Sequence, residues 1–226
     1  MVNKNIKYLI STHMPKAGGT SFKKFLVDNY KDKVYLDYDR KDFTQTLIQK
    51  EKKLSNKIKN TINEKNIYHG HFCTEKYNIF ESDRRNYFIT WLRNPLDRLI
   101  SHYYYTHQTY NPKNPNLFHK IVIEQNWSLM DFCLSIYVKN IYFQYLGNFN
   151  IDRLNFIGIF EYYNEDFNYL TKNILNLSNI TLPNINKTTK NKSVEFNKIQ
   201  INKIKEFHSK DYDLYNYALT LRSERV

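Results

Sequence analysis

Short apolar runs that end at polar or glycine-rich turns recur along this chain of 226 residues. Runs of this kind are typical of buried strands. They predict strands at residues 6–12, 33–38, 66–72, 86–93 and 153–160. The segments between them carry apolar residues at helical spacing. Strands that alternate with helices favour an α/β fold with a mainly parallel central sheet flanked by helices, and such sheets bind ligands at the carboxyl ends of their strands.

The helical periodicity predicts the remaining elements. Pro95 suits the first turn of a helix, and Asn164 suits the capping position of another. Helices are predicted directly after Gly19, at 41–60, at 95–107, within 117–146, after Asn164, and at about 197–207 and 210–222. Residues 111–116 and 182–193 are rich in turn formers and are predicted to be loops. The chain has no internal repeat and no linker, so we predict a single domain over residues 1–226.

The net charge of +12 indicates an anionic partner, such as a nucleotide, nucleic acid, an acidic polymer or a membrane surface. A lysine-rich composition without functional meaning explains the charge equally well. An aromatic share of 16% excludes disorder of the whole chain. The two cysteines, Cys73 and Cys133, lack metal-ligand spacing. No apolar run approaches a membrane span, and the amino-terminal run is too short for a signal peptide, so we expect a cytoplasmic protein without membrane insertion.

Candidate chemistry begins at residues 11–22, STHMPKAGGTSF, between the first strand and the first helix. A strand, a glycine-rich turn and a helix amino terminus together form an anion site. In the nucleotide triphosphatase loop, G-x-x-x-x-G-K-[ST], a lysine stands where this chain has Gly19, whereas its own lysine, Lys16, lies inside the turn. The sequence also offers no convincing strand that ends in a magnesium-binding aspartate. The pattern therefore predicts a loop for an anion without a metal, and a sulfuryl group fits; a plain strand-to-helix turn is the structural alternative.

Several motifs in order resemble those of carbohydrate sulfotransferases, and specifically the uronosyl 2-O-sulfotransferase group. HMPKAGGTSF resembles their 5′-phosphosulfate loop, and YFITWLRNPLDRLISHYYY resembles their 3′-phosphate motif. YHGHF, GIFEYYNEDF, NKTTKNK and DYDLYNYA resemble four further segments of the same proteins, up to about residue 219. The segment 107–150 is shorter and different, which bears on the acceptor more than on the donor.

The resemblance implies a P-loop-NTPase-like domain that takes its sulfuryl group from 3′-phosphoadenosine 5′-phosphosulfate (PAPS), releases 3′-phosphoadenosine 5′-phosphate (PAP) and uses no metal. Lys16 would stabilise the leaving phosphate. Independently of the resemblance, Arg93 follows a buried strand, so its guanidinium is expected at the carboxyl edge of the sheet, ready for bidentate phosphate contact unless it pairs with Asp97. The implied donor-binding residues are Pro15, Lys16, Ala17, Gly18, Gly19, Thr20, Ser21, Arg93, Ser101, Lys187, Thr188 and Thr189.

A base must take the proton of the attacking hydroxyl, and YHGHF offers two histidines. Residues two apart on a strand share a face, so His69 and His71 are both expected to face the cleft. We predict His69 as the general base, with His71 orienting it or holding the acceptor; His13, inside the loop, is the rival. Glu161 ends a strand near the expected cleft, where it positions the acceptor or pairs with a lysine.

The sequence thus predicts an enzyme that sulfates a glycan or another hydroxyl acceptor, and not a nucleic-acid-binding protein. Two alternatives remain at this stage. One is a metal-dependent P-loop kinase or nucleotidase, but the lysine of the nucleotide triphosphatase loop is missing from its usual position, which argues against this alternative. The other is a non-catalytic binder of nucleic acid that uses the positive charge. The acceptor, the position sulfated and the oligomeric state are open.

Overall fold

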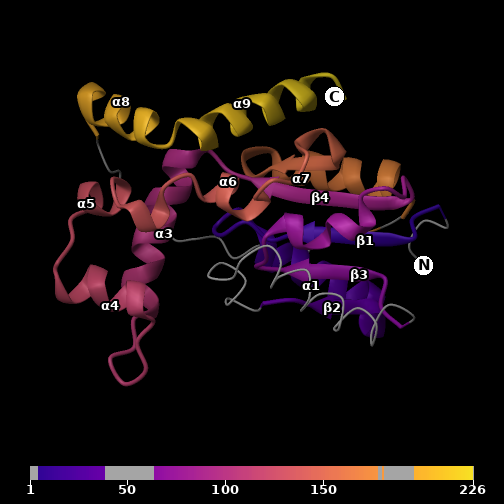
Figure 1. Ribbon diagram of the computed structural model, residues 1–226, viewed down its shortest axis with the longest axis horizontal. Coiled ribbons are helices and arrows are strands. Elements are labelled where there is room, and N and C mark those ends of the chain that lie inside the picture. Colours follow the sequence, from indigo (N-terminus) through magenta and orange to yellow (C-terminus); the bar gives the residue numbers. More distant parts are fainter. Residues whose placement is uncertain (1–4, 39–63, 178–179, 181–195, 226) are drawn as a thin grey trace.

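The structure is a computed structural model that describes residues 5–38, 64–177, 180 and 196–225. Within them, five strands form one entirely parallel sheet in the order β2–β3–β1–β4–β5 (Figure 1). The strands are β1 (Tyr8–Thr12), β2 (Val34–Leu36), β3 (Ile67–Gly70), β4 (Asn86–Leu92) and β5 (Leu154–Ile159). All five occur where the apolar runs predict them. Together with the glycine-rich loop between β1 and the first helix, they confirm the predicted P-loop-NTPase-like α/β fold.

The central strand β1 pairs with β3 on one side and with β4 on the other. Its last residue, Thr12, lies beside Gly70 of β3 and Thr90 of β4, so the three strands end at the same edge of the sheet. Every residue of β1 and β3 is buried, as expected for a parallel sheet covered on both faces. The chain segments that leave this edge are therefore the ones that can build a common site.

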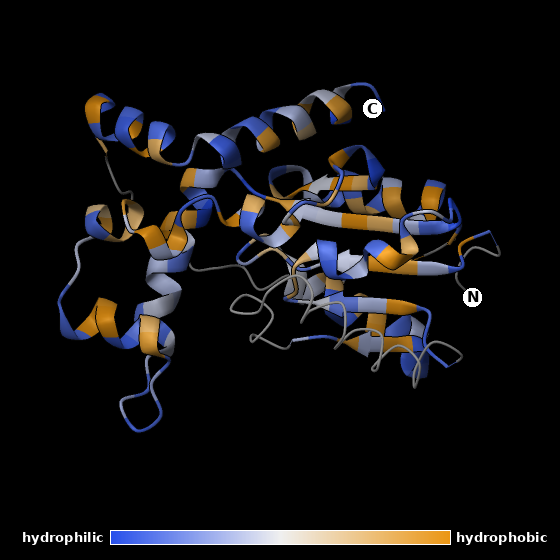
Figure 2. Cartoon of the chain, in the orientation of Figure 1, coloured by the Kyte–Doolittle hydropathy of each residue, from blue (hydrophilic) through white to orange (hydrophobic). Residues whose placement is uncertain are grey.

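Helices cover the sheet through their apolar faces. Helix α1 (Gly19–Tyr30) buries Phe22, Phe25 and Leu26 in the main core. Helix α7 (Tyr163–Tyr169) and helix α9 (Ser209–Ser223) pack against β5. The hydrophobic residues in Figure 2 concentrate on the strands and on the helix faces turned toward them. Burial of this apolar surface is the main source of the stability of the sheet layer.

A second group of helices lies beside the sheet (Figure 1). Helix α3 (Pro95–Thr109) leaves the end of β4 and packs with α4 (Leu117–Glu124) and α5 (Leu129–Cys133). With α8 (Lys198–Phe207) they enclose a smaller apolar cluster. Its buried members are Leu99, Val122, Phe132, Cys133, Val138, Ile141 and Ile204. Because α3 begins at the carboxyl edge, this helical group forms a wall beside that edge.

The elements differ from the predictions in several places. Helix α7 begins at Tyr163, without a side-chain cap, so the predicted cap at Asn164 is wrong. A 3₁₀ turn, Phe160–Tyr162, runs directly into this helix, and the Asp166 carboxylate accepts a hydrogen bond from the Ile159 backbone N–H instead. The segment 117–146 contains α4, α5 and α6 (Ile141–Leu146) separated by turns.

Helices α8 and α9 confirm the two carboxyl-terminal predictions. The predicted helix at 41–60 and the predicted loop at 182–193 lie outside the described residues. None of the described helices combines the length and the apolarity needed to cross a membrane.

Candidate active site

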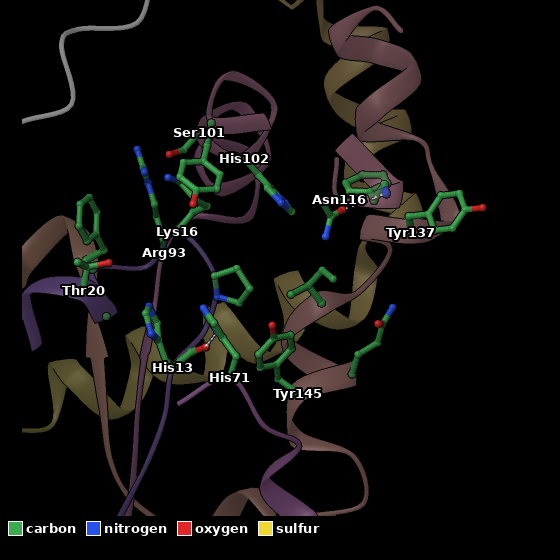
Figure 3. A pocket seen from close by; sticks show the side chains of 18 of the residues that line it. His13, Lys16, Thr20, His71, Arg93, Ser101, His102, Asn116, Tyr137 and Tyr145 are labelled. Carbon is green, nitrogen blue, oxygen red and sulfur yellow. Dashed lines mark hydrogen bonds between the residues drawn. The ribbon is translucent and has the colours of Figure 1, made fainter. Parts of the chain in front are cut away.

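A cavity of about 570 Å³ opens at the carboxyl ends of β1, β3 and β4 (Figure 3). Its lining comes from five places: the loop between β1 and α1, the residues after β3 and β4, one face of α3, the segment from Asn116 to Tyr145, and Phe160 after β5. Ten of the residues proposed from the sequence line it, namely His13, Pro15, Lys16, Gly18, Gly19, Thr20, Ser21, His71, Arg93 and Ser101. The fold therefore brings together, across some 90 residues of sequence, most of the predicted site.

The loop that precedes α1 depends on two glycines. Gly18 has φ +85 and occupies the capping position of α1, in the left-handed region that suits glycine. At Gly19, an added Cβ would lie 1.9 Å from Cδ2 of His13, so a larger residue cannot fit without moving that ring. The start of α1 therefore packs closely against the His13 ring. The first turn of α1 lines the cavity, and a helix amino terminus with its backbone N–H groups is a feature that binds anions.

Lys16 belongs to the same loop, where it adopts a left-handed backbone with φ 64. Its ammonium Nζ lies 4.0 Å from the centroid of the Tyr105 ring on α3. Burial, and secondly the nearby charge of Arg93, lower the pKa of Lys16. Two cations thus share one end of the cavity, and an anion placed between them would relieve their repulsion.

Arg93 follows the last residue of β4 and is held firmly by its backbone. Its N–H donates to the hydroxyl of Tyr142, 3.0 Å away, and its C=O accepts from that same hydroxyl at 2.6 Å. The guanidinium lies 4.8 Å from the centroid of the Phe160 ring, and its buried Nε has no hydrogen-bond partner among the described residues. No ion pair with Asp97 forms in the described part of the chain. A fixed arginine with an unpaired buried donor fits a phosphate.

Ser101 lies two turns into α3 and is 5% exposed. Its side chain lines the cavity on the side of Lys16 and Arg93 (Figure 3). The cation pair, the hydroxyl and the amino terminus of α1 come from three segments of the chain. Together they fit a ligand with two separate anionic groups.

Three histidine rings stack at the ends of β1 and β3. The His13 ring lies 4.2 Å from that of His71 and 5.2 Å from that of His69, centroid to centroid. His71 lines the cavity, whereas His69 is 1% exposed and lies outside the lining. The prediction that both histidines face the cleft is therefore wrong for His69. The reason is that β3 ends at Gly70, so strand alternation stops between the two, and His13 separates His69 from the cavity.

Each of these rings has a hydrogen bond at Nδ1, and the bond of His71 fixes its tautomer. His71 Nδ1 lies 2.7 Å from the His13 carbonyl oxygen, which only accepts, so Nδ1 carries a hydrogen and Nε2 is the basic atom of the neutral ring. His69 Nδ1 pairs with the Ser11 hydroxyl at 2.9 Å, and burial lowers the pKa of His69 to about 3. His13 pairs with the Tyr38 hydroxyl at 3.0 Å. Burial first, and then its histidine neighbours, hold the pKa of His13 well below its usual range.

Other predicted residues lie elsewhere. Ala17 is fully buried and does not line the cavity. Glu161 is outside the lining as well: its carboxylate accepts from the Asn94 backbone N–H at 2.8 Å and from the Tyr215 hydroxyl at 3.1 Å. It therefore holds the turn between β4 and α3. Lys187, Thr188 and Thr189 lie outside the described residues.

The sequence analysis missed about half of the lining. These residues are His102, Tyr105, Asn116, Phe118, His119, Tyr137, Ile141, Gln144, Tyr145 and Phe160. Tyr105 stands one helical turn after Ser101, so helical periodicity alone could have found it. The residues of α4 and α6 carry no such signal, because their place beside the cavity depends on how the helical group packs.

Comparison with known proteins gives this site its context. The sulfotransferase of Alicyclobacillus acidocaldarius has a TM-score of 0.49 and 14% identity, over 90% of this chain and 91% of that one. The mouse sulfotransferase SULT7A1, whose structure is a complex with PAP, has a TM-score of 0.40 and 16% identity, over 91% of this chain and 64% of that one. No curated protein matches the sequence. The profile described as the sulfotransferase family matches residues 2–218, and the chain therefore belongs to the sulfotransferase family.

Proposed function

We propose that this sulfotransferase uses PAPS as its donor and a carbohydrate hydroxyl as its acceptor. The observation that carries the proposal is the meeting of Lys16, Arg93 and Ser101 at one cavity beside the amino terminus of α1. The loop from Pro15 to Ser21 would hold the 5′-phosphosulfate, and Arg93 with Ser101 would hold the 3′-phosphate. The unpaired Nε of Arg93 fits such a ligand.

The residues at the site suit sulfuryl transfer. When bound, PAPS supplies the sulfuryl group, whose bond to the phosphate oxygen breaks as the acceptor oxygen bonds to sulfur. The ammonium of Lys16 would stabilise the negative charge left on that phosphate oxygen. The hydrogen bond between His13 and the Tyr38 hydroxyl would keep the loop in place.

For the general base we propose His71 instead of His69. His71 lines the cavity, and its Nδ1–H bond to the His13 carbonyl leaves Nε2 as the proton-accepting atom. His69 is buried behind His13. Burial lowers its pKa, so the ring stays neutral without being placed to take a proton from an acceptor. In this proposal His69 and His13 support His71 through the stack of rings.

A carbohydrate acceptor is supported by the far end of the cavity. The rings of Phe118, Tyr137 and Tyr145 line it together with the amides of Asn116 and Gln144. A sugar has an apolar face for aromatic rings and hydroxyl groups for amides. The motif resemblance to the uronosyl 2-O-sulfotransferases points to the same class of acceptor, and cytoplasmic location stays a prediction.

The test is transfer of labelled sulfate from PAPS to a panel of neutral glycans, uronic-acid glycans and phenols. We expect labelled glycan and no labelled phenol; labelling of phenols alone would contradict the carbohydrate acceptor. The same assay in EDTA should keep its activity, because Gly19 replaces the lysine of the nucleotide triphosphatase loop. Activity that is lost in EDTA and restored by Mg²⁺ would instead favour metal-dependent chemistry of the kinase type.

A further inference from the structure

Tyr105 is the lining residue that contacts the ammonium of Lys16, and it comes from a different element. The Nζ–centroid distance of 4.0 Å lies well within the range of a cation–π interaction. Ser101 and Tyr105 stand one turn apart on α3 and line the same cavity. The other edge of the Tyr105 ring meets His119 of α4, 6.2 Å away between centroids in a T-shaped arrangement. The ring is thus held by the helical group while Lys16 approaches from the loop.

The surroundings of Lys16 explain why such a contact matters. Among the described residues, the groups that act electrostatically with its ammonium include Arg93 at the end of β4, His13 at the end of β1 and His102 on α3. None of these carries a negative charge, and Arg93 repels the ammonium. The electron-rich face of Tyr105 is a neutral partner that attracts a cation without occupying the place of an anionic ligand.

We propose that Tyr105 is a positioning residue, whose ring holds the Lys16 ammonium in the cavity, charged and aimed at the leaving oxygen. This inference rests on the proposed function, because it assigns Tyr105 to the same transfer step. Tyr105 acts through Lys16 and does not itself contact the acceptor.

A direct test measures Lys16 itself and needs no turnover. Acetylation by acetic anhydride, followed by mass spectrometry across a pH series, reports the pH at which Lys16 becomes reactive. Without the ring, in Tyr105→Leu, this midpoint should fall by about 0.4 to 1.5 pH units. Tyr105→Phe keeps the ring and should keep the midpoint. Tyr104→Leu, the same change one residue away and outside the lining, is the matched control.

A kinetic cycle then tests the link to transfer. Tyr105→Leu should lower kcat about 2- to 30-fold, with the KM for the acceptor little changed, and Tyr105→Phe should restore it. In a Lys16→Ala background, Tyr105→Leu should cost nothing further, since its partner is gone.

The outcomes separate the two ideas. An unchanged Lys16 midpoint in Tyr105→Leu overturns the proposal. So does a full additional loss in the Lys16→Ala background, or a raised acceptor KM at normal kcat, because both would make Tyr105 an acceptor contact. A shifted midpoint in a protein that transfers no sulfate from PAPS supports the pairing and contradicts the proposed function alone.

Discussion

At the scale of single residues, the role of Lys16 is tested by removing its charge. Lys16→Ala should lower kcat by about 10²- to 10³-fold, because the group would act mainly on charge that develops as the S–O bond breaks. PAP affinity, measured by calorimetry, should change much less, since in the proposed function Arg93 and Ser101 would bind the other end of the ligand. Lys16→Arg is the control that keeps the charge. Near-normal turnover in the alanine variant would rule out the assignment.

His71 and His69 give opposite expectations when each is replaced by alanine. His71→Ala should reduce kcat by about 10²- to 10⁴-fold at an almost unchanged Tm, because it would remove the base from the cavity wall. His69→Ala should lower the Tm, since its ring fills a fully buried place beside Phe22 and His13. If a folded His69→Ala variant loses the rate and His71→Ala keeps it, the base is His69, as the sequence predicted.

At the scale of elements, the turn between β4 and α3 is held from both sides. The Tyr142 hydroxyl of α6 accepts a hydrogen bond from the Arg93 N–H and donates one to the Arg93 C=O. The Asn94 side chain caps α3 by accepting from the Leu96 and Asp97 N–H groups, and Glu161 accepts from the Asn94 backbone. The position of Arg93 therefore depends on contacts with two other segments of the chain.

Tyr142→Phe tests this arrangement. It removes one hydroxyl and leaves two backbone groups of Arg93 without their partner, which should cost about 1–3 kcal/mol of stability. We also expect weaker binding of PAP, but not of 5′-AMP, which lacks the 3′-phosphate. Tyr217→Phe removes an exposed hydroxyl bonded to Asp152 and should change neither quantity. Equal losses for PAP and 5′-AMP would show that Arg93 does not read the 3′-phosphate.

At the scale of the whole molecule, buried histidines make the fold sensitive to acid. Burial lowers the pKa of His69 and His102 to about 3 and that of His208 to about 4. His208 is bonded on both sides as a neutral ring: Nε2–H donates to the Cys133 carbonyl and Nδ1 accepts from the Asn140 N–H. A second ring proton would face that N–H and break the link between α5, α6 and the start of α9.

The sign of the pH effect follows from these shifts. The folded pKa values lie below the unfolded value of about 6.5, so the stabilisation is present above that pH and is lost as pH falls toward the folded values of about 3 to 4. Asp211, whose pKa burial raises to about 6, acts in the opposite direction but is a single group. We expect the Tm to fall between pH 7 and pH 5, and His208→Gln to flatten this fall. His107→Gln, at an exposed position, should leave the slope unchanged; a flat wild-type profile would contradict the argument.

The sequence by itself determined the framework of this protein. The apolar runs of β1, β3 and β4 and the turn formers between them are local signals, so the parallel sheet and the glycine-rich loop could be predicted. Lys16 and Arg93 could be placed at the carboxyl edge because each follows a predicted strand closely, whereas Ser101 was predicted from the motif resemblance. Their meeting at one edge follows from the geometry of any parallel α/β sheet.

Only the tertiary structure decided the contacts between segments. Strand β3 ends at Gly70, beside the end of β1. For this reason His71 lies at the cavity and His69 lies behind His13. The packing of α6 brings Tyr142 into contact with Arg93. The position of α3 beside the loop brings Tyr105 into contact with Lys16. Such contacts depend on distances between chain segments 49 to 89 residues apart, as for Tyr142 with Arg93 and Tyr105 with Lys16. Local periodicity carries no information on those distances, because they are set by the packing of whole elements against one another.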